Sequence, residues 1–381
     1  MKIRPIAIYL PQYHPIPEND EWWGKGFTEW TNVTKAKPRF KGHYQPHLPA
    51  DLGFYDLRLE EARLAQEKLA KEYGIYGFCY YHYWFNGRRI LEKPLNEKLK
   101  NPKEELPFMM CWANENWSRR WDGSENDILL QQNYSNEDHI EHIKYLIPFF
   151  KDPRYIKIDG KCVFSIYRSD LIPDLPDAIK LWRSVARENE IELYIIRFEG
   201  LMKTGKEFMI DGLDAATEFQ PHSAINKLNI RRSDKKGIKD ELSFTSVLNS
   251  LFAHTGNIYK KYFAKEFDGI VQSYGELVKS DLTEMDCDYK RFNCVSPGWD
   301  NSCRKAKKYR ILTDSTPDLF REWTNHKLKI FKPYSEKENL FFINAWNEWA
   351  EGNHLEPDRK WGKKHLQELK DAVAKNENPS I

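Results

Sequence analysis

The sequence predicts an α/β fold, a (β/α)8 TIM barrel formed by a single domain with long βα loops. Eight apolar runs of strand length occur along the chain, and helical patterns separate them. Strands that alternate with helices form a parallel sheet, and eight such units close into a barrel. The alternative is an open doubly wound sheet, whose first strand normally leads into a Gly-rich turn, but residues 10–14 here read Leu-Pro-Gln-Tyr-His. The eight runs are residues 3–10, 76–81, 107–113, 161–167, 192–198, 214–219, 291–295 and 340–345.

Start and stop signals locate the helices between these runs. Asp56 is placed to cap the first helix and Gly74 lies just past its end, while Ser135 and Asp138 have the spacing of a capping box. Thr316 precedes a proline, the order expected of a cap and a first helical residue. The predicted helices cover 58–73, a segment from about 137, 177–188, a segment from 317, and 364–375, which is followed by a frayed tail.

Composition excludes several classes of function. The 381 residues include 59 Lys and Arg against 57 Asp and Glu, a net charge of +2, so no long-range field attracts nucleic acid or an acidic membrane. No apolar run approaches the ~18 residues that span a bilayer. The N-terminal apolar run is too short for a signal peptide, so we expect a cytoplasmic protein without membrane insertion. Six cysteines without a CxxC pair indicate reduced, buried thiols.

Motifs for metal or cofactor binding are missing from the sequence. There is no HExxH zinc motif, no phosphate-binding P-loop and no GxSxG hydrolase elbow. Glu351 and His354 have the spacing of a metal-ligand pair in a helical bundle, but no second copy exists and the predicted fold is not a bundle. We therefore expect neither a metal nor a cofactor.

Aromatic residues mixed with amides, carboxylates and imidazoles follow seven of the eight predicted strands. In a barrel these strand ends meet at one face and build the active site. Sugars need both kinds of group, since their C–H faces pack on aromatic rings and their hydroxyls need polar partners. The predicted substrate-binding residues are Tyr13, His14, His82, Tyr83, Trp84, Trp112, Asn114, Glu115, Trp117, Glu218, Trp299, Asp300, Trp346 and Asn347.

Glu348 and Glu351 are the predicted catalytic residues. Side chains three apart on a helical turn share a face, with Cβ atoms ~5–6 Å apart. Glycoside chemistry uses two carboxyl groups around one bond, and retaining enzymes hold them ~5–5.5 Å apart. Because like charges at that range do not both ionise freely, one pKa should rise and supply the acid. Trp346, Trp349 and Gly352 surround the pair directly after a buried strand.

The chain resembles the family 99-like glycoside hydrolase domain of the WbsX group, found among polysaccharide-cluster proteins. The motifs that carry the resemblance are AIYLPQYH at 7–14, GFTEWTN at 26–32, HYQP at 43–46, GFCYYHYW at 77–84, CWANENW at 111–117, SPGWDN at 296–301 and NAWNEWAEG at 344–352. The resemblance implies a catalytic domain over 1–358, leaving 359–381 as a closing helix and tail. It also implies retaining chemistry through a 1,2-anhydro sugar, with Glu348 as base for the sugar's 2-hydroxyl and Glu351 as acid/base, and without a metal.

Three functional hypotheses follow from these observations. The first is a glycosidase or transglycosylase acting on a surface polysaccharide with the two glutamates. The second, suggested by the label given to WbsX-like proteins, is a glycosyltransferase of O-antigen or capsular polysaccharide biosynthesis that uses an activated sugar donor. The third is a noncatalytic glycan-binding protein. The sugar, its linkage, the oligomeric state and the roles of Glu115, Glu199 and Asp300 stay open.

Overall fold

The predicted barrel is present in the computed structural model, which describes residues 2–119, 124–201, 203–229, 269–283, 287–331 and 334–377. Its parallel strands follow one another around the ring in chain order, and the last one pairs with the first. They are β1 (Arg4–Tyr9), β2 (Gly77–Phe85), β4 (Phe108–Trp112), β8 (Lys161–Ile166), β9 (Leu193–Glu199), β10 (Ala215–Glu218), β12 (Arg291–Phe292), β13 (Cys294–Val295) and β15 (Leu340–Ile343). Each of the eight predicted runs overlaps one of these strands or, in one case, two, although β2 and β9 end later than predicted.

Strands β12 and β13 together form the seventh position of the barrel. β12 pairs with β10, and β13 pairs with β15, so the ring is interrupted only at Asn293 between them. The Asn293 carbonyl still accepts a hydrogen bond from the Phe342 N–H at 2.9 Å. Its side chain donates to the Lys327 carbonyl at 2.9 Å, which ties this point of the ring to the outer helix layer. The barrel is therefore nearly closed, as the eight-unit pattern predicts.

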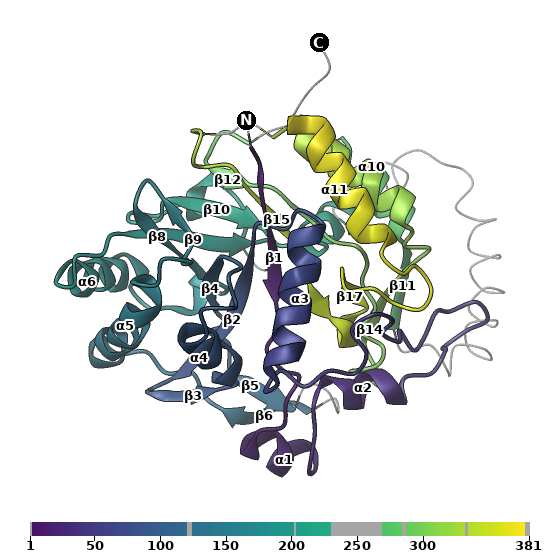
Figure 1. Ribbon diagram of the computed structural model, residues 1–381, viewed down its shortest axis with the longest axis horizontal. Coiled ribbons are helices and arrows are strands. Elements are labelled where there is room, and N and C mark those ends of the chain that lie inside the picture. The colour runs from purple at the N-terminus through teal and green to yellow at the C-terminus, as the bar shows by residue number, and fades with distance from the viewer. Residues whose placement is uncertain are drawn as a thin grey trace, which may run out of the picture.

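Helices surround the barrel on its outside (Figure 1). They are α3 (Glu60–Glu72), α4 (Lys93–Lys100), α5 (Asn136–Phe150), α6 (Leu175–Arg187), α9 (Tyr274–Asp281), α10 (Pro317–Lys329) and α11 (Lys364–Glu377). Their apolar faces and the outward side chains of the strands form one continuous core. α11 packs on α10, and its Leu366 and Leu369 are buried in that core. No helix among the described residues is long and apolar enough to cross a membrane.

Short elements gather at the carboxyl end of the barrel, opposite the N-terminus (Figure 1). These are the helices α1 (Pro17–Trp23) and α2 (Glu29–Lys35), and the hairpin of β5 (Trp117–Arg119) and β6 (Ser124–Leu130). A second hairpin, β16 (Asn347–Glu348) and β17 (Asn353–His354), encloses the 3-10 turn η3 (Trp349–Glu351), against which α2 packs. The remaining short strands are β3 (Arg88–Ile90), β7 (Lys157–Ile158), β11 (Gly269–Ser273) and β14 (Tyr309–Thr313).

Two of the three predicted helix caps are confirmed. The Ser135 hydroxyl accepts from the Asp138 N–H at 3.1 Å, and the Thr316 hydroxyl accepts from the Leu319 N–H at 3.3 Å. The prediction for Asp56 was wrong, because α3 begins later, with Leu59 at the cap position. The Asp56 carboxylate instead pairs with Arg58 at 2.6 Å.

Candidate active site

A cavity of about 450 Å³ lies at the carboxyl end of the barrel. All eight strand positions contribute to it, either through the strand end or through the loop that follows. Its lining includes Leu10, Gln12, Tyr81, Tyr83, Glu115, Asn116, Trp117, Tyr167, Arg168, Leu201, Phe219, His222, Trp299, Asn301, Arg304, Lys305, Glu348 and Glu351. This is the face at which barrel enzymes assemble their active sites.

The β16–β17 hairpin brings Glu348 and Glu351 to this cavity. Asn347 fixes the start of the hairpin on the end of β1, because its Oδ1 accepts from the Leu10 N–H at 2.8 Å and its Nδ2 donates to the Leu10 carbonyl at 2.9 Å. The Tyr13 hydroxyl donates to the Asn347 carbonyl. Gly352 ends the turn in the left-handed region at φ 56°, and a Cβ there would lie 3.0 Å from the Asp300 side chain. The glutamates therefore sit on a rigidly anchored turn.

Arg304 joins the two predicted catalytic carboxylates. Its guanidinium lies 2.9 Å from Glu348 and 2.7 Å from Glu351, and a further 3.0 Å contact reaches Glu29 at the start of α2. Glu29 is fully buried, and the Glu348 and Glu351 side chains are 7% and 20% exposed. Three carboxyl groups thus contact one guanidinium group in a region that is largely shielded from solvent. Of the two predicted catalytic residues, Glu351 is the more accessible.

Burial and mutual repulsion raise the pKa values of this cluster. Burial raises the pKa of Glu348 to about 8, and the charges of Glu351 and Glu29 act in the same direction while Arg304 opposes them. Burial also raises the pKa values of Glu351 and Glu29 against the effect of Arg304. The cluster therefore retains protons near neutral pH, and the glutamates can exchange protons with a bound molecule, as general acid and base catalysis requires.

Aromatic rings and further ion pairs form the walls of the cavity. Trp117 packs edge-on against Tyr83 with ring centroids 5.3 Å apart. Across the site, Trp299 packs edge-on against His222 at 4.6 Å. Arg168 pairs with Glu115 and, at 2.8 Å, with Asp170. The cavity thus combines flat apolar faces with charged and hydrogen-bonding groups, the lining expected of a sugar site.

Six of the predicted site residues line the cavity: Tyr83, Glu115, Trp117, Trp299, Glu348 and Glu351. The other ten lie behind its wall or elsewhere in the barrel. Several of them hold the lining residues in place. These residues follow the strand ends because they support the cavity wall, and they do not line the cavity themselves.

The alternation of β2 explains two of these ten residues. β2 continues to Phe85, four residues beyond the predicted end, so its side chains alternate between the two faces of the barrel. Tyr81 and Tyr83 face the cavity, whereas His82 and Trp84 face α5, where His82 contacts His142 at 2.9 Å and Trp84 donates to Asp138 at 2.8 Å. Trp112 on the neighbouring β4 likewise packs outward.

A second group supports the loops of the cavity from behind. Asn114 exchanges two hydrogen bonds of 2.8 Å with the backbone of Arg168 and so positions that residue. Tyr13 and Asn347 anchor the hairpin as described above, and Trp346 packs on Phe78 with ring centroids 5.0 Å apart. His14 is buried and does not line the cavity.

Two predicted acidic residues lie away from the cavity for different reasons. Glu218 points to the helix layer, where Lys327 of α10 pairs with it at 3.0 Å. Asp300 accepts hydrogen bonds of 2.7 Å from both His43 and Gln45 and lines a second cavity. Glu199, whose role was open, is buried and bonded to Tyr289 at 2.7 Å.

Sequence reasoning missed several residues that shape the site. Arg304, Arg168, Tyr81 and His222 line the cavity, and Glu29 completes the acidic cluster. Glu29 lies inside the GFTEWTN motif, so this motif could have identified Glu29 as a candidate site residue. Arg304 lies in a loop without apolar periodicity or a recognisable motif, and only the fold reveals that it meets the glutamates.

Comparison with known proteins now identifies the family. Residues 5–369 match the family described as Glycosyltransferase WbsX. The chain belongs to the WbsX family. Two relatives described as "Uncharacterized protein WxcX", from Xanthomonas campestris pv. campestris strains ATCC 33913 and B100, are each 37% identical over 375 residues. The alignment covers 97% of this chain and 49% of each relative, so the chain spans about half the length of these two relatives.

Solved structures support the barrel assignment for this WbsX-family chain. A "Glycoside hydrolase-like protein" aligns with a TM-score of 0.60 at 14% identity over 98% of this chain and 94% of its own. The GH99 endo-alpha-mannosidase from Bacteroides thetaiotaomicron aligns with a TM-score of 0.54 at 12% identity, covering 99% of this chain and 98% of its own. Together, the family match and these likenesses show a WbsX-family chain with the barrel fold of these structures.

Proposed function

We propose that the protein cleaves or transfers a glycosidic bond with retention of configuration, with Glu348 and Glu351 as catalytic residues. The observation that carries the proposal is the position of both carboxyl groups on one guanidinium in an aromatic-lined cavity at the carboxyl end of the barrel. Burial raises the pKa of Glu351, which supports its proposed role as the general acid.

The first step forms a 1,2-anhydro sugar. The Glu348 carboxylate takes the proton of the sugar's 2-hydroxyl while that oxygen attacks the anomeric carbon. The bond from the anomeric carbon to the leaving oxygen breaks, and Glu351 gives its proton to that oxygen. Attack from the 2-oxygen requires it to lie trans to the leaving group, so the proposed substrates carry 1,2-trans linkages, as α-mannosides do.

The second step opens this ring. The Glu351 carboxylate takes a proton from water or from an acceptor hydroxyl, whose oxygen attacks the anomeric carbon. The bond to the 2-oxygen breaks, and that oxygen recovers its proton from Glu348. Both glutamates end in their starting states. The greater exposure of Glu351 supports its role here, since it must meet an incoming molecule that Glu348 need not reach.

A glycosyltransferase that uses an activated sugar is the second candidate, favoured by the description of the family. Such a donor would bring phosphate groups, and Lys305 in the cavity lining offers positive charge to them. The acceptor would be a growing surface polysaccharide, such as O-antigen or capsule. A noncatalytic glycan-binding role is the third candidate and predicts no turnover of any glycan.

One experiment separates the three candidates. The Glu351→Gln protein, which retains the shape of the site, is screened on a glycan array, and the wild-type protein is then given the glycans that bind. Release of a reducing end with retained anomeric configuration, without added nucleotide-sugar, supports the glycosidase. Turnover only with a nucleotide-sugar, with nucleotide release, would contradict it. Glu141→Gln on the exposed face of α5 is a matched control, since its side chain is 63% exposed.

A further inference from the structure

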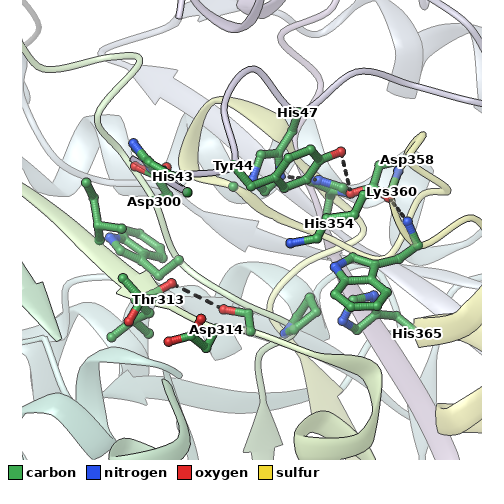
Figure 2. A pocket seen from close by; sticks show the side chains of 18 of the residues that line it. His43, Tyr44, His47, Asp300, Thr313, Asp314, His354, Asp358, Lys360 and His365 are labelled. Atoms are coloured by element: carbon green, nitrogen blue, oxygen red, sulfur yellow. Dashed lines mark hydrogen bonds and ion pairs between the residues drawn. The ribbon is translucent and has the colours of Figure 1, made fainter. Parts of the chain in front are cut away.

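A second cavity, of about 310 Å³, lies next to the first. Trp299 lines both, and the turn that carries Glu351 contributes its next residue, Gly352, to the second. Figure 2 shows this second cavity, where His47, His354 and Asp358 lie close together beside Tyr44 and Lys360. None of these three residues takes part in the proposed catalytic steps.

The three side chains have the chemistry and spacing of metal ligands. One nitrogen from each histidine and one carboxylate oxygen of Asp358 lie within 4.8 Å of one another. His47 Nδ1 and His354 Nε2 are 3.0 Å apart. Two ligands of a tetrahedral Zn²⁺ with bonds of ~2.0–2.1 Å stand about 3.3 Å apart, so a small outward movement of the rings admits the ion.

Neighbouring groups prepare His354 for a metal. Its Nδ1 lies 2.9 Å from the Glu356 carbonyl, which can only accept a hydrogen bond, so Nδ1 carries the proton and Nε2 presents its lone pair to His47.

Asp358 supplies a buried negative charge to the same point. Its carboxylate accepts from the backbone N–H groups of Lys360 and Trp361 at 3.0 and 2.6 Å, and from the Tyr44 hydroxyl at 3.2 Å. Among the residues that the structure describes, no lysine or arginine side chain forms an ion pair with it. A divalent cation bound here would balance this negative charge, beside Lys360, whose Nζ lies 4.6 Å from the centroid of the Tyr44 ring.

We propose that His47, His354 and Asp358 bind a divalent transition metal, with Zn²⁺ as the fitting ion. Two imidazole nitrogens and one carboxylate oxygen match the ligand set of a zinc site that leaves one position open to the cavity. On binding, His47 takes the tautomer with its proton on Nε2, and the metal replaces the hydrogen bond between the two rings.

The metal would clamp the turn that carries the glutamates. His354 lies in β17, opposite Asn347 in β16, and its ring stacks on Trp349 of η3 with centroids 3.7 Å apart. His47 comes from the loop between α2 and α3, which is far from His354 in the chain. An ion bound to both would tie this loop to the hairpin.

The test uses untagged protein stripped with EDTA, titrated with ZnCl₂ by calorimetry and checked by elemental analysis. We expect one Zn²⁺ per chain, a higher melting temperature with the ion, and at least ~10-fold weaker binding for His47→Ala and His354→Ala. His326→Ala on α10 is the control and should bind as the wild type does. His47→Ala changes a loop residue, so it tests the site even if His354→Ala does not fold.

Equal Zn²⁺ affinity of His47→Ala and wild type, or no binding at about 100 µM ZnCl₂, where a site of micromolar Kd is almost full, would overturn the proposal. Binding is measured without turnover, so this result is independent of the proposed glycosidase activity.

Discussion

Two buried ionic clusters of this barrel contain carboxylates predicted from sequence, and they differ in charge balance. In the first cluster, Glu348, Glu351 and Glu29 share Arg304. In the second, Glu218 and Asp281 contact Lys327 at 3.0 and 2.9 Å, and Lys227 lies 3.7 and 3.6 Å from them.

The charge balance has opposite effects on the two clusters. Burial alone would raise the pKa of Asp281, but Lys327 and Lys227 hold it below its usual value against the charge of Glu218. Glu348 has the same kind of burial, yet its pKa rises to about 8, because Glu351 and Glu29 add to the effect of burial. Burial therefore does not separate the proposed catalytic carboxylates from the structural ones in this protein, whereas the ratio of acidic to basic groups does.

Glu351→Gln should have the largest effect on catalysis. Removal of a general acid lowers kcat by ~10²–10⁴-fold, while the glutamine keeps the size of the side chain and the fold. The measurement is kcat on the glycan identified by the array, with thermal unfolding of the same sample. Glu218→Gln is the counterpart in the second cluster and should lower stability more than kcat. The opposite pattern would show that the roles of the two clusters are reversed.

Lys327→Met should have the largest effect on stability. Lys327 is fully buried, and its removal leaves the carboxylates of Glu218 and Asp281 with too little positive charge. Breaking a buried pair in this way costs about 3–5 kcal/mol in the free energy of unfolding. Urea unfolding measures the loss, and Lys180→Met on the exposed face of α6 is the control. A loss below about 1 kcal/mol would mean that the second cluster does not stabilise the barrel.

The first cluster should make stability depend on pH in a definite direction. The pKa of Glu348 is higher in the folded protein than in the unfolded chain, so the folded state binds more protons between about pH 4.5 and pH 8. The free energy of unfolding should therefore decrease by up to a few kcal/mol as pH rises through this range. Glu348→Gln should flatten the curve, measured by urea unfolding at several pH values. An unchanged slope in this variant would assign the effect to other groups.

The sequence was sufficient for the barrel and for the acidic pair, because both depend on short-range patterns. Apolar runs of strand length predict β1, β4 and β8 within a residue or two of their ends. Glu348 and Glu351 follow a buried strand directly, which places them at the cavity. His82 and Trp84 were predicted to lie in the site because the predicted strand ended at residue 81. In the structure β2 continues to Phe85, and the alternation of its side chains directs these two residues outward.

Contacts between distant segments could not be predicted from the sequence. Arg304 meets Glu29 across 275 residues, and His47 meets His354 across 307. Glu218 illustrates the same limit, since its position at a strand end gives no sign that Lys327 lies behind it. Charge balance, which distinguishes the two clusters, is a property of the folded protein and needs the positions of the cations.

The smallest expected effect is on the pH dependence of kcat/KM, which tests whether Glu348 must be ionised for catalysis. If Glu348 acts as base for the 2-hydroxyl, it must be ionised, and its pKa of about 8 leaves only a minor fraction ionised at neutral pH. The rate should then rise about 10-fold per pH unit below pH 8, up to the pH at which Glu351 loses the proton that it needs as acid. A rate that does not rise between about pH 6 and pH 8 would contradict the role of Glu348 as base. Arg304→Gln removes the charge that favours ionised Glu348, so the rise should move to higher pH, whereas Lys327→Met should lower stability and leave this profile in place.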